Sequence, residues 1–394
     1  MFLTTEEERM LSGEEGHATR KAMQILVALG KIYGADRLVE VSSVQVSGVS
    51  YKNLGDAGLE FLDDLARDGR ARVKTTLNPA GMSLTDWKSQ GIQPAFAEKQ
   101  LRVIDAYRRL GVEVSCTCTP YIAGNEPEFG QHIAWGESSA VAYANSVIGA
   151  RTNREGGPSA LMASLTGRTP LYGLHLDGNR VPTLAVDVEA RLERPEDFSA
   201  MGYSVGKKAT DGIPLFTGIK EANLEDLKTL SAALASSGGV AMFHIDGLTP
   251  EAEVGPHPAN RVTFTPKDLI DARLSLDDEG VPDFVSVGCP HCSLAELALL
   301  AELLRGARVK REFWICCSRE VKRQSDEAGY SRWILGSGAK IATDTCMVVA
   351  PVEELGHRVV ATNSAKACHY LRNAGLRVRF LSLEECVAVA TESR

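Results

Sequence analysis

Residues 57–81, AGLEFLDDLARDGRARVKTTLNPAG, decide the fold class. The first half has a helical pattern, a strand-like run follows at 72–77, and the run ends in the turn-forming residues NPAG at 78–81. The order then repeats, because residues 96–110 again have a helical pattern and 112–116 are strand-like. Alternating helices and strands of this kind predict parallel strands covered by helices, and therefore an α/β fold.

The alternation extends over the rest of the chain. The first thirty residues predict one long helix, opened by a capping-box pattern at 4–7, and the segments 205–320 and 339–394 alternate again. Binding groups are expected at the carboxyl ends of the strands. We expect three parts: an α/β domain at 1–135, a central helical and polar-loop segment at 136–205, and a second α/β portion at 206–394.

Composition limits the class of protein. Of the 394 residues, 44% are hydrophobic and 24% are charged, which is typical of a folded globular protein. The formal net charge of -8 argues against a nucleic-acid binder, because such proteins need basic surface, and it favours a small substrate. The N-terminus lacks an export signal, and no stretch has the roughly 18 to 20 apolar residues of a membrane span. We therefore expect a cytoplasmic protein without a membrane partner.

The nine cysteines do not form the pattern of a disulfide framework, because their number is odd, the chain is large and no export signal is present. They are interpreted as thiols or metal ligands. Three of them stand where a strand gives way to a loop with turn residues: Cys118, Cys289 and Cys346. These three are far apart in sequence, so a site built from them has to be assembled by tertiary structure.

Several kinds of site can be built from cysteines. A buried cysteine usually behaves as a small hydrophobe, and Cys368 and Cys386, in apolar helical surroundings, are expected in the core. Residues 289–292, CPHC, are similar to half of a zinc ribbon, but no second close pair follows at the usual spacing. Iron-sulfur clusters also need thiolates, and a cluster held by three of them leaves one iron open to a substrate hydroxyl.

Five motifs are similar to those of one known family. They are CTPY at 118–121, WGESSAVAYANS at 135–146, GARTNREGGP at 149–158, GCPH at 288–291 and DTCM at 344–347. On these motifs the chain resembles the aconitase X family, large-subunit type, over essentially its whole length. Residues 49–58 look like the archaeal branch of that family.

The resemblance has implications for the fold and the cofactor. It implies an aconitase-like, multi-domain, three-layer α/β architecture with parallel sheets. It also implies that Cys118, Cys289 and Cys346 hold an iron-sulfur cluster, of the 4Fe-4S type or, as the alternative in this family, 2Fe-2S. Cys116 lies two residues from Cys118 and is the other candidate for the first ligand, but the family's Cys-Thr-Pro-Tyr pattern favours Cys118.

The substrate loops of the family match eight residues of this chain. They are Gly48, Val49, Ser50, Asn78, Pro79, Glu137, Ser138 and Lys366. Backbone donors around Gly48 and the hydroxyl of Ser50 can receive phosphate or carboxylate oxygens, while Lys366 supplies a compact positive charge. The alternatives are structural: Glu137 and Ser138 suit a helix N-terminus, and Lys366 suits a solvated helix face.

Other polar residues lie within or near these motifs. Arg151 and Arg154 either bridge domains or, in their glycine-rich setting, approach an anion closely. Scattered histidines are more often structural or surface groups, so no catalytic role is assigned to them. These histidines are His132, His175, His244 and His291.

The resemblance implies a hydro-lyase, the large subunit of an enzyme that dehydrates (R)-5-phosphomevalonate to trans-anhydromevalonate 5-phosphate in the archaeal mevalonate pathway. Dehydration removes a weakly acidic proton beside a carboxylate and expels hydroxide, and an open cluster iron assists the second step. The base is expected to be a serine of a separate small subunit, so the catalytic residue of this chain is unknown and the assembly is at least a heterodimer. The alternatives are a cis-3-hydroxy-L-proline dehydratase of the same family and a non-catalytic iron-sulfur scaffold subunit.

Overall fold

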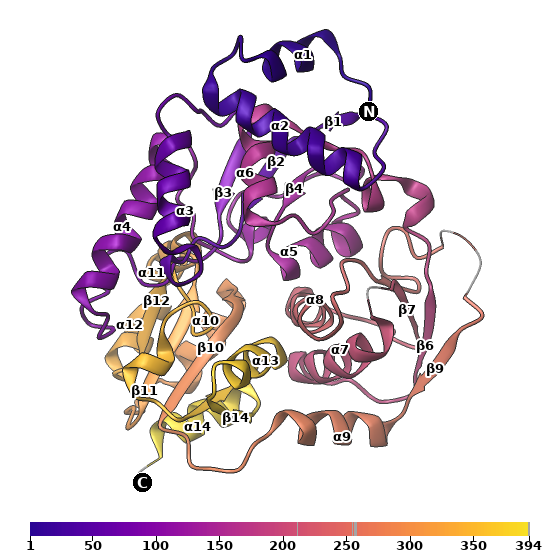
Figure 1. Cartoon of the computed structure of the whole chain (residues 1–394). Helices are drawn as coiled ribbons and strands as arrows, with labels where there is room; N and C mark the ends of the chain where they lie inside the picture. The colour runs from indigo at the N-terminus through magenta and orange to yellow at the C-terminus, as the bar shows by residue number, and fades with distance from the viewer. Residues whose placement is uncertain (211, 254, 256–257, 393–394) are drawn as a thin grey trace.

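The computed structural model describes residues 1–210, 212–253, 255 and 258–392 (Figure 1). Within these residues, the strands form three parallel sheets and one antiparallel pair, and helices cover the sheets. In Figure 1 the first parallel sheet lies at the top, the second at the right and the third at the lower left. The α/β class with parallel sheets is therefore confirmed. The domain bounds at 135 and 205 stay a prediction.

The first parallel sheet has the strand order β3-β2-β4, with β2 at Ser43–Val46, β3 at Lys74–Leu77 and β4 at Ala134–Trp135. Its helices are α1 (Thr5–Ser12), α2 (His17–Ile32), α3 (Tyr51–Leu65), α4 (Pro94–Arg109) and α6 (Gly157–Thr166). Apolar residues from these helices and strands form one buried cluster, because each helix turns an apolar face inward. Beside the sheet, β1 (Leu38–Glu40) pairs antiparallel with β5 (Arg168–Pro170).

The second parallel sheet has the order β8-β7-β6-β9. Its strands are β6 (Leu184–Val188), β7 (Pro214–Thr217), β8 (His244–Ile245) and β9 (Arg261–Phe264). The helices α7 (Pro195–Ala209) and α8 (Leu224–Gly238) pack on it through an apolar cluster that includes Phe198, Phe216 and Leu234. Helix α9 (Pro266–Leu276) leads from this sheet toward the third.

The third parallel sheet has the order β12-β11-β10-β13-β14 and helices on both faces, which gives three layers (Figure 1). Alternation along the strands separates two cores: Phe284 and Trp314 face one, and Val285 and Phe313 face the other. The strands are β10 (Phe284–Cys292), β11 (Glu312–Cys317), β12 (Lys340–Thr343), β13 (Val359–Thr362) and β14 (Arg377–Phe380). The helices are α10 (Leu294–Leu303), α11 (Arg319–Glu327), α12 (Tyr330–Gly336), α13 (Ala365–Asn373) and α14 (Leu383–Thr391).

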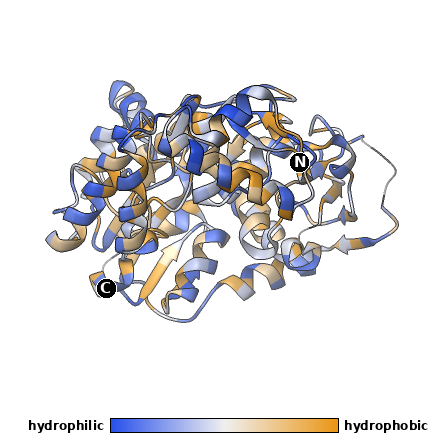
Figure 2. Ribbon diagram, turned by 45° about the horizontal axis from the view of Figure 1, so that its top comes forward, coloured by the Kyte–Doolittle hydropathy of each residue, from blue (hydrophilic) through white to orange (hydrophobic). Residues whose placement is uncertain are grey.

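Hydropathy follows these layers. Figure 2 shows hydrophobic strand segments between helices of mixed hydropathy, as expected when each helix has one face on a sheet and one in solvent. None of the helices in the described part of the chain is long and apolar enough to cross a membrane.

Two predicted helices differ in extent from those observed. The long N-terminal helix is two helices, because Gly13 and Gly16 adopt φ values of 95° and 100° that end the first helix and turn the chain. The helix predicted at 57–68 begins earlier, at Tyr51, and contains a kink at Gly55. Glycine at that position favours a break that apolar spacing alone does not reveal.

The strand predicted at 112–116 is not a strand. The segment makes one isolated bridge to the first sheet through Glu113. Beyond it, the hydroxyl of Ser115 accepts from the N–H of Leu77 at 3.1 Å and takes a position that a backbone carbonyl occupies in a regular ladder. Cys116 then adopts a φ of 44°, which is incompatible with an extended strand.

Candidate functional site

A cavity of about 390 Å³ lies where loops from the first and third sheets meet. The three predicted thiols and five of the eight predicted substrate residues line it: Cys118, Cys289, Cys346, Asn78, Pro79, Glu137, Ser138 and Lys366. Backbone contacts join the two sheets beside the cavity, because the N–H of Ala80 donates to the carbonyl of Asp344 at 2.7 Å. Residues that are far apart in sequence are thus gathered at one place.

Each thiol is held by a different loop. Cys118 lies in the loop between α4 and β4 of the first sheet, and Cys346 follows β12 of the third sheet. Cys289 lies in an irregular part of β10, after Gly288, whose φ is 93°. A Cβ atom at Gly288 would lie 2.1 Å from the carbonyl oxygen of Cys316, so only glycine lets the two backbones approach this closely.

The three thiols interact with one another. Burial raises the pKa of the Cys118 thiol to about 12 and also raises the pKa of Cys289 and of Cys346, and mutual repulsion between the thiolates adds to the shift at Cys118 and Cys346. Thiolates at these positions therefore need positive charge beside them, which the irons of a cluster supply. Among the described residues, no three Cys, His, Asp or Glu side chains are arranged to hold a single metal ion. The donor set fits a cluster, whose thiolates are spread over several irons.

A buried ion pair forms another side of the cavity. Lys366, near the start of α13, contacts the carboxylate of Glu137, which caps α5 (Ser138–Tyr143). The same carboxylate accepts from the amide of Asn78 at 2.7 Å and from the hydroxyl of Ser139 at 2.9 Å. Burial alone would raise the pKa of Glu137, but the charge of Lys366 and these hydrogen bonds hold it below its ordinary value.

The ion pair decides between the alternatives for these residues. Lys366 is 6% exposed, so the interpretation as a solvated helix lysine is wrong. Burial would lower the pKa of its ammonium group, but the carboxylate of Glu137 and the nearby thiols raise it, so Lys366 is charged. Glu137 does cap a helix, because it accepts from the N–H of Ser139 at 3.3 Å, and it holds Lys366 as well.

Asn78 lines the cavity beside the ion pair, and three other predicted substrate residues lie outside the lining. The carbonyl oxygen of the Asn78 side chain is buried and has no hydrogen-bond partner, so it can accept from a ligand. Gly48, Val49 and Ser50 are not among the residues that line the cavity. They stand next to it, because the hydroxyl of Ser50 donates to the carbonyl of Val349, a lining residue, at 3.2 Å.

The other cysteines lie outside the cavity. All nine, which fall in the described ranges, are buried and free. Cys116 belongs to the core of the first sheet and does not line the cavity, so of the two neighbouring cysteines the structure brings Cys118 to the site. Cys368 and Cys386 belong to the two cores of the third sheet, as their apolar surroundings predicted.

Six lining residues were absent from the predicted set, and three of them have polar side chains: Asn53, Arg154 and Tyr370. Arg154 is exposed, and its guanidinium donates to the carbonyl of Gly239 at 2.8 Å. It also lines a second cavity of about 710 Å³ beside the first. The glycine-rich motif around Arg154 was the sequence signal for an anion site, because glycines allow an anion to approach closely. The motif did not distinguish an arginine that bridges two domains from one that binds an anion.

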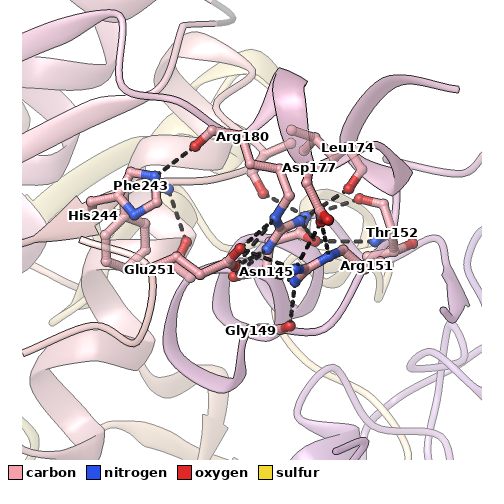
Figure 3. Close-up of polar contacts among 12 residues, drawn as sticks. Asn145, Gly149, Arg151, Thr152, Leu174, Asp177, Arg180, Phe243, His244 and Glu251 are labelled. Carbon is pink, nitrogen blue, oxygen red and sulfur yellow. Dashed lines mark hydrogen bonds and ion pairs between the residues drawn. The ribbon is translucent and has the colours of Figure 1, made fainter. Parts of the chain in front are cut away.

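A buried polar network fixes the segment that leads to Arg154 (Figure 3). Arg180 is fully buried, and its guanidinium donates to the carboxylate of Glu251 and to the side-chain oxygen of Asn145. Arg151 donates to the same carboxylate at 3.3 Å. The amide of Asn145 donates to the carbonyl of Thr152 and to the carbonyl of Ala241, both at 2.9 Å, so it joins the segment before Arg154 to the residues that precede β8.

The chain is similar to known proteins over nearly its whole length. Family models match it as aconitase X first domain over residues 1–178, second domain over 182–273 and third domain over 282–392. The phosphomevalonate dehydratase large subunit of Methanocaldococcus jannaschii is 49% identical over 384 residues, covering 94% of this chain and 95% of that protein. The large subunit of the same name from Methanothermobacter thermautotrophicus is 50% identical over 376 residues, covering 94% of each. The crystal structure of Thermococcus kodakaraensis aconitase X in its holo-form has a TM-score of 0.93 at 47% identity and covers 99% of this chain and 100% of that one.

Fold and site together define an α/β protein with three parallel sheets and a cavity lined by three buried thiols and an ion pair. The three matched regions each contain one of the parallel sheets. The chain belongs to the aconitase X family.

Proposed function

We propose that this chain is the large subunit of an iron-sulfur hydro-lyase that dehydrates (R)-5-phosphomevalonate to trans-anhydromevalonate 5-phosphate. The observation that carries the proposal is the cavity in which three thiols from distant loops stand next to a buried, charged lysine. Archaeal relatives at 49% and 50% identity bear the name of this activity and match the chain over nearly its whole length.

Cys118, Cys289 and Cys346 are the proposed ligands of the cluster. Three thiolates suit a 4Fe-4S cluster with one open iron, and a 2Fe-2S cluster is the alternative. When bound, such a cluster supplies a Lewis acid that assists the departure of the substrate hydroxyl.

The remaining lining residues bind and orient the substrate. Lys366 offers a fixed positive charge to an anionic group, because Glu137 holds the ammonium in one place. The free side-chain oxygen of Asn78 and the hydroxyl of Ser138 offer hydrogen bonds. The neighbouring loop of Gly48, Val49 and Ser50, together with the lining residue Pro79, positions a phosphate or carboxylate group.

The catalytic base is proposed to come from a small subunit. Glu137 cannot serve easily, because Lys366, Asn78 and Ser139 already occupy its carboxylate. No histidine lines the cavity in the part of the chain that the structure describes. A serine delivered by a partner subunit fits this arrangement, so we expect the chain by itself to be inactive. We also propose a cytoplasmic location, which the free thiols support because reducing compartments keep thiols unpaired.

The test is a dehydration assay under anaerobic conditions on the chain co-expressed with its small subunit. Turnover of 5-phosphomevalonate, with no turnover by the chain alone, is the expected result. Turnover of cis-3-hydroxy-L-proline instead would assign the other activity of the family. An iron-loaded pair that converts neither substrate would favour a non-catalytic scaffold subunit and contradict the proposal.

A further inference from the structure

His291 is a buried group that the proposed reaction does not use. It lies in β10, two residues after Cys289, and is 0% exposed. Its backbone carbonyl accepts from the ammonium of Lys228 at 3.1 Å, which fixes the main chain at this point. Its other polar atoms all contact the segments that carry the remaining two thiols.

Three contacts connect His291 to those segments. The Nδ1 atom lies 3.0 Å from the hydroxyl of Thr117, the residue before Cys118. The Nε2 atom lies 3.1 Å from the carbonyl oxygen of Thr345, the residue before Cys346. The backbone N–H donates to the sulfur of Cys118 itself at 3.2 Å. One residue therefore contacts all three cysteine loops, because it belongs to the loop of Cys289.

The partners determine how the ring is protonated. A carbonyl oxygen can only accept, so Nε2 carries the proton that binds Thr345. Nδ1 is then the acceptor, and the hydroxyl of Thr117 donates to it while accepting from the N–H of Thr119 at 3.2 Å. Each hydrogen bond in this series therefore has a defined direction.

We infer that His291 is a positioning residue, which holds the three cysteine loops in register so that their thiols meet around one iron-sulfur cluster. The inference rests on the proposed function. In metal sites, removing a group that orients the ligands typically weakens metal affinity by roughly 10-fold to 100-fold. We therefore expect His291 to control how tightly iron is retained, beyond what it contributes to folding.

The test uses the chain co-expressed with its small subunit and compares His291→Leu with His244→Leu. His244 is an equally buried histidine that donates to the carbonyl of Arg180, away from the thiols, so it controls for the loss of a buried imidazole. The rate of iron loss to a chelator and the thermal unfolding midpoint are measured for both. His291→Leu is expected to lose iron about tenfold or more faster than His244→Leu.

Milder variants keep the inference testable when His291→Leu folds poorly. His291→Gln retains an amide donor that can reach Thr345, and it is expected to restore part of the iron retention. Thr117→Val removes the hydroxyl at nearly constant volume, and it is expected to speed iron loss less than His291→Leu does. Adding Thr117→Val to His291→Leu is expected to change the rate of iron loss little, because both changes break the same hydrogen bond. Iron loss that follows the unfolding midpoint across all variants would overturn the inference.

Failure of the proposed function gives a different result. If the wild-type pair binds no iron, the cluster assignment fails, and the positioning role is decided by alkylation of the full chain with iodoacetamide followed by mass spectrometry. If His291 holds the loops, Cys118 and Cys346 should be alkylated about tenfold faster in His291→Leu than in His244→Leu, because lost hydrogen bonds let the loops open more often. Equal alkylation rates would overturn the positioning role.

Discussion

Replacing Lys366 with methionine removes the positive partner of a buried carboxylate. The side chains of Lys366 and Glu137 are 8% and 10% exposed, so water cannot replace the lost charge. Hydrogen bonds from Asn78 and Ser139 would remain, but neither carries charge. Breaking a buried ion pair from one side costs about 3–5 kcal/mol, and we expect Lys366→Met to lower the free energy of unfolding by about that much at pH 7.

Removing both charges should reverse most of this loss. The double variant Lys366→Met with Glu137→Gln leaves no buried charge, and such replacements are often close to neutral. The contribution of Glu137 to the free energy of unfolding should also change its pH dependence in sign between the wild type and Lys366→Met. In the wild type the pKa of Glu137 is below its ordinary value of 4.5, so its ionisation stabilises the fold above that pH, and the contribution is lost as the pH falls through the lowered pKa. In Lys366→Met burial dominates and raises that pKa, so stability is highest below pH 4.5 and falls as the pH rises.

The assay is urea unfolding of the iron-free chain, followed by circular dichroism between pH 4 and pH 8. Lys267→Met is the matched control, because Lys267 is an exposed lysine of α9 that pairs with Asp271 on the helix surface, and the midpoint should stay unchanged. The reasoning is refuted if Lys366→Met costs less than about 1 kcal/mol, the size of a surface pair, or if the double variant is no more stable than the single one.

Three further changes test other parts of the structure. Glu251→Gln should lower the free energy of unfolding by about 3–5 kcal/mol, because it leaves the fully buried Arg180 without its carboxylate, and a loss below about 1 kcal/mol would contradict the buried network. Burial raises the pKa of Glu196 to about 7, so the free energy of unfolding should fall as the pH rises from 4.5 to 7. Glu196→Gln should flatten this slope in denaturant titrations, and an unchanged slope would contradict the raised pKa. Gly48→Ala adds a methyl to open space at a φ of 73°, so it and the matched control Gly34→Ala at 69° should both cost roughly 1–2 kcal/mol. Only Gly48→Ala should raise the KM for 5-phosphomevalonate, and equal KM values would remove the Gly48 loop from the substrate site.

The sequence was sufficient for the fold class and for the assembly of the thiols. Strand and helix patterns repeat at short range, and Cys289 and Cys346 interrupt and follow strands of the third sheet, so parallel topology brings them to the strand ends. Cys118 follows a segment that makes only one isolated bridge to the first sheet. Ser115 shows the limit of such patterns. A single hydroxyl replaced a ladder bond and ended a strand that apolar residues alone had predicted.

Properties that depend on distant partners could not be predicted from the residues alone. Lys366 has the sequence context of an ordinary helix lysine, and its burial against Glu137 exists only in the folded chain. His291 was visible beside Cys289, but its bonds to Thr117 and Thr345 join segments from two other parts of the chain. Buried polar contacts of this kind depend on side-chain geometry that local patterns do not contain.

The most direct test of the cavity as a cluster site is to count iron and inorganic sulfide in the anaerobically purified pair with single cysteine-to-serine changes. We expect about four irons in the wild type, a large loss in Cys118→Ser, Cys289→Ser and Cys346→Ser, and little loss in the core control Cys368→Ser. Retention of the full iron content in any of the three cavity variants, or its loss in Cys368→Ser alone, would contradict the assignment.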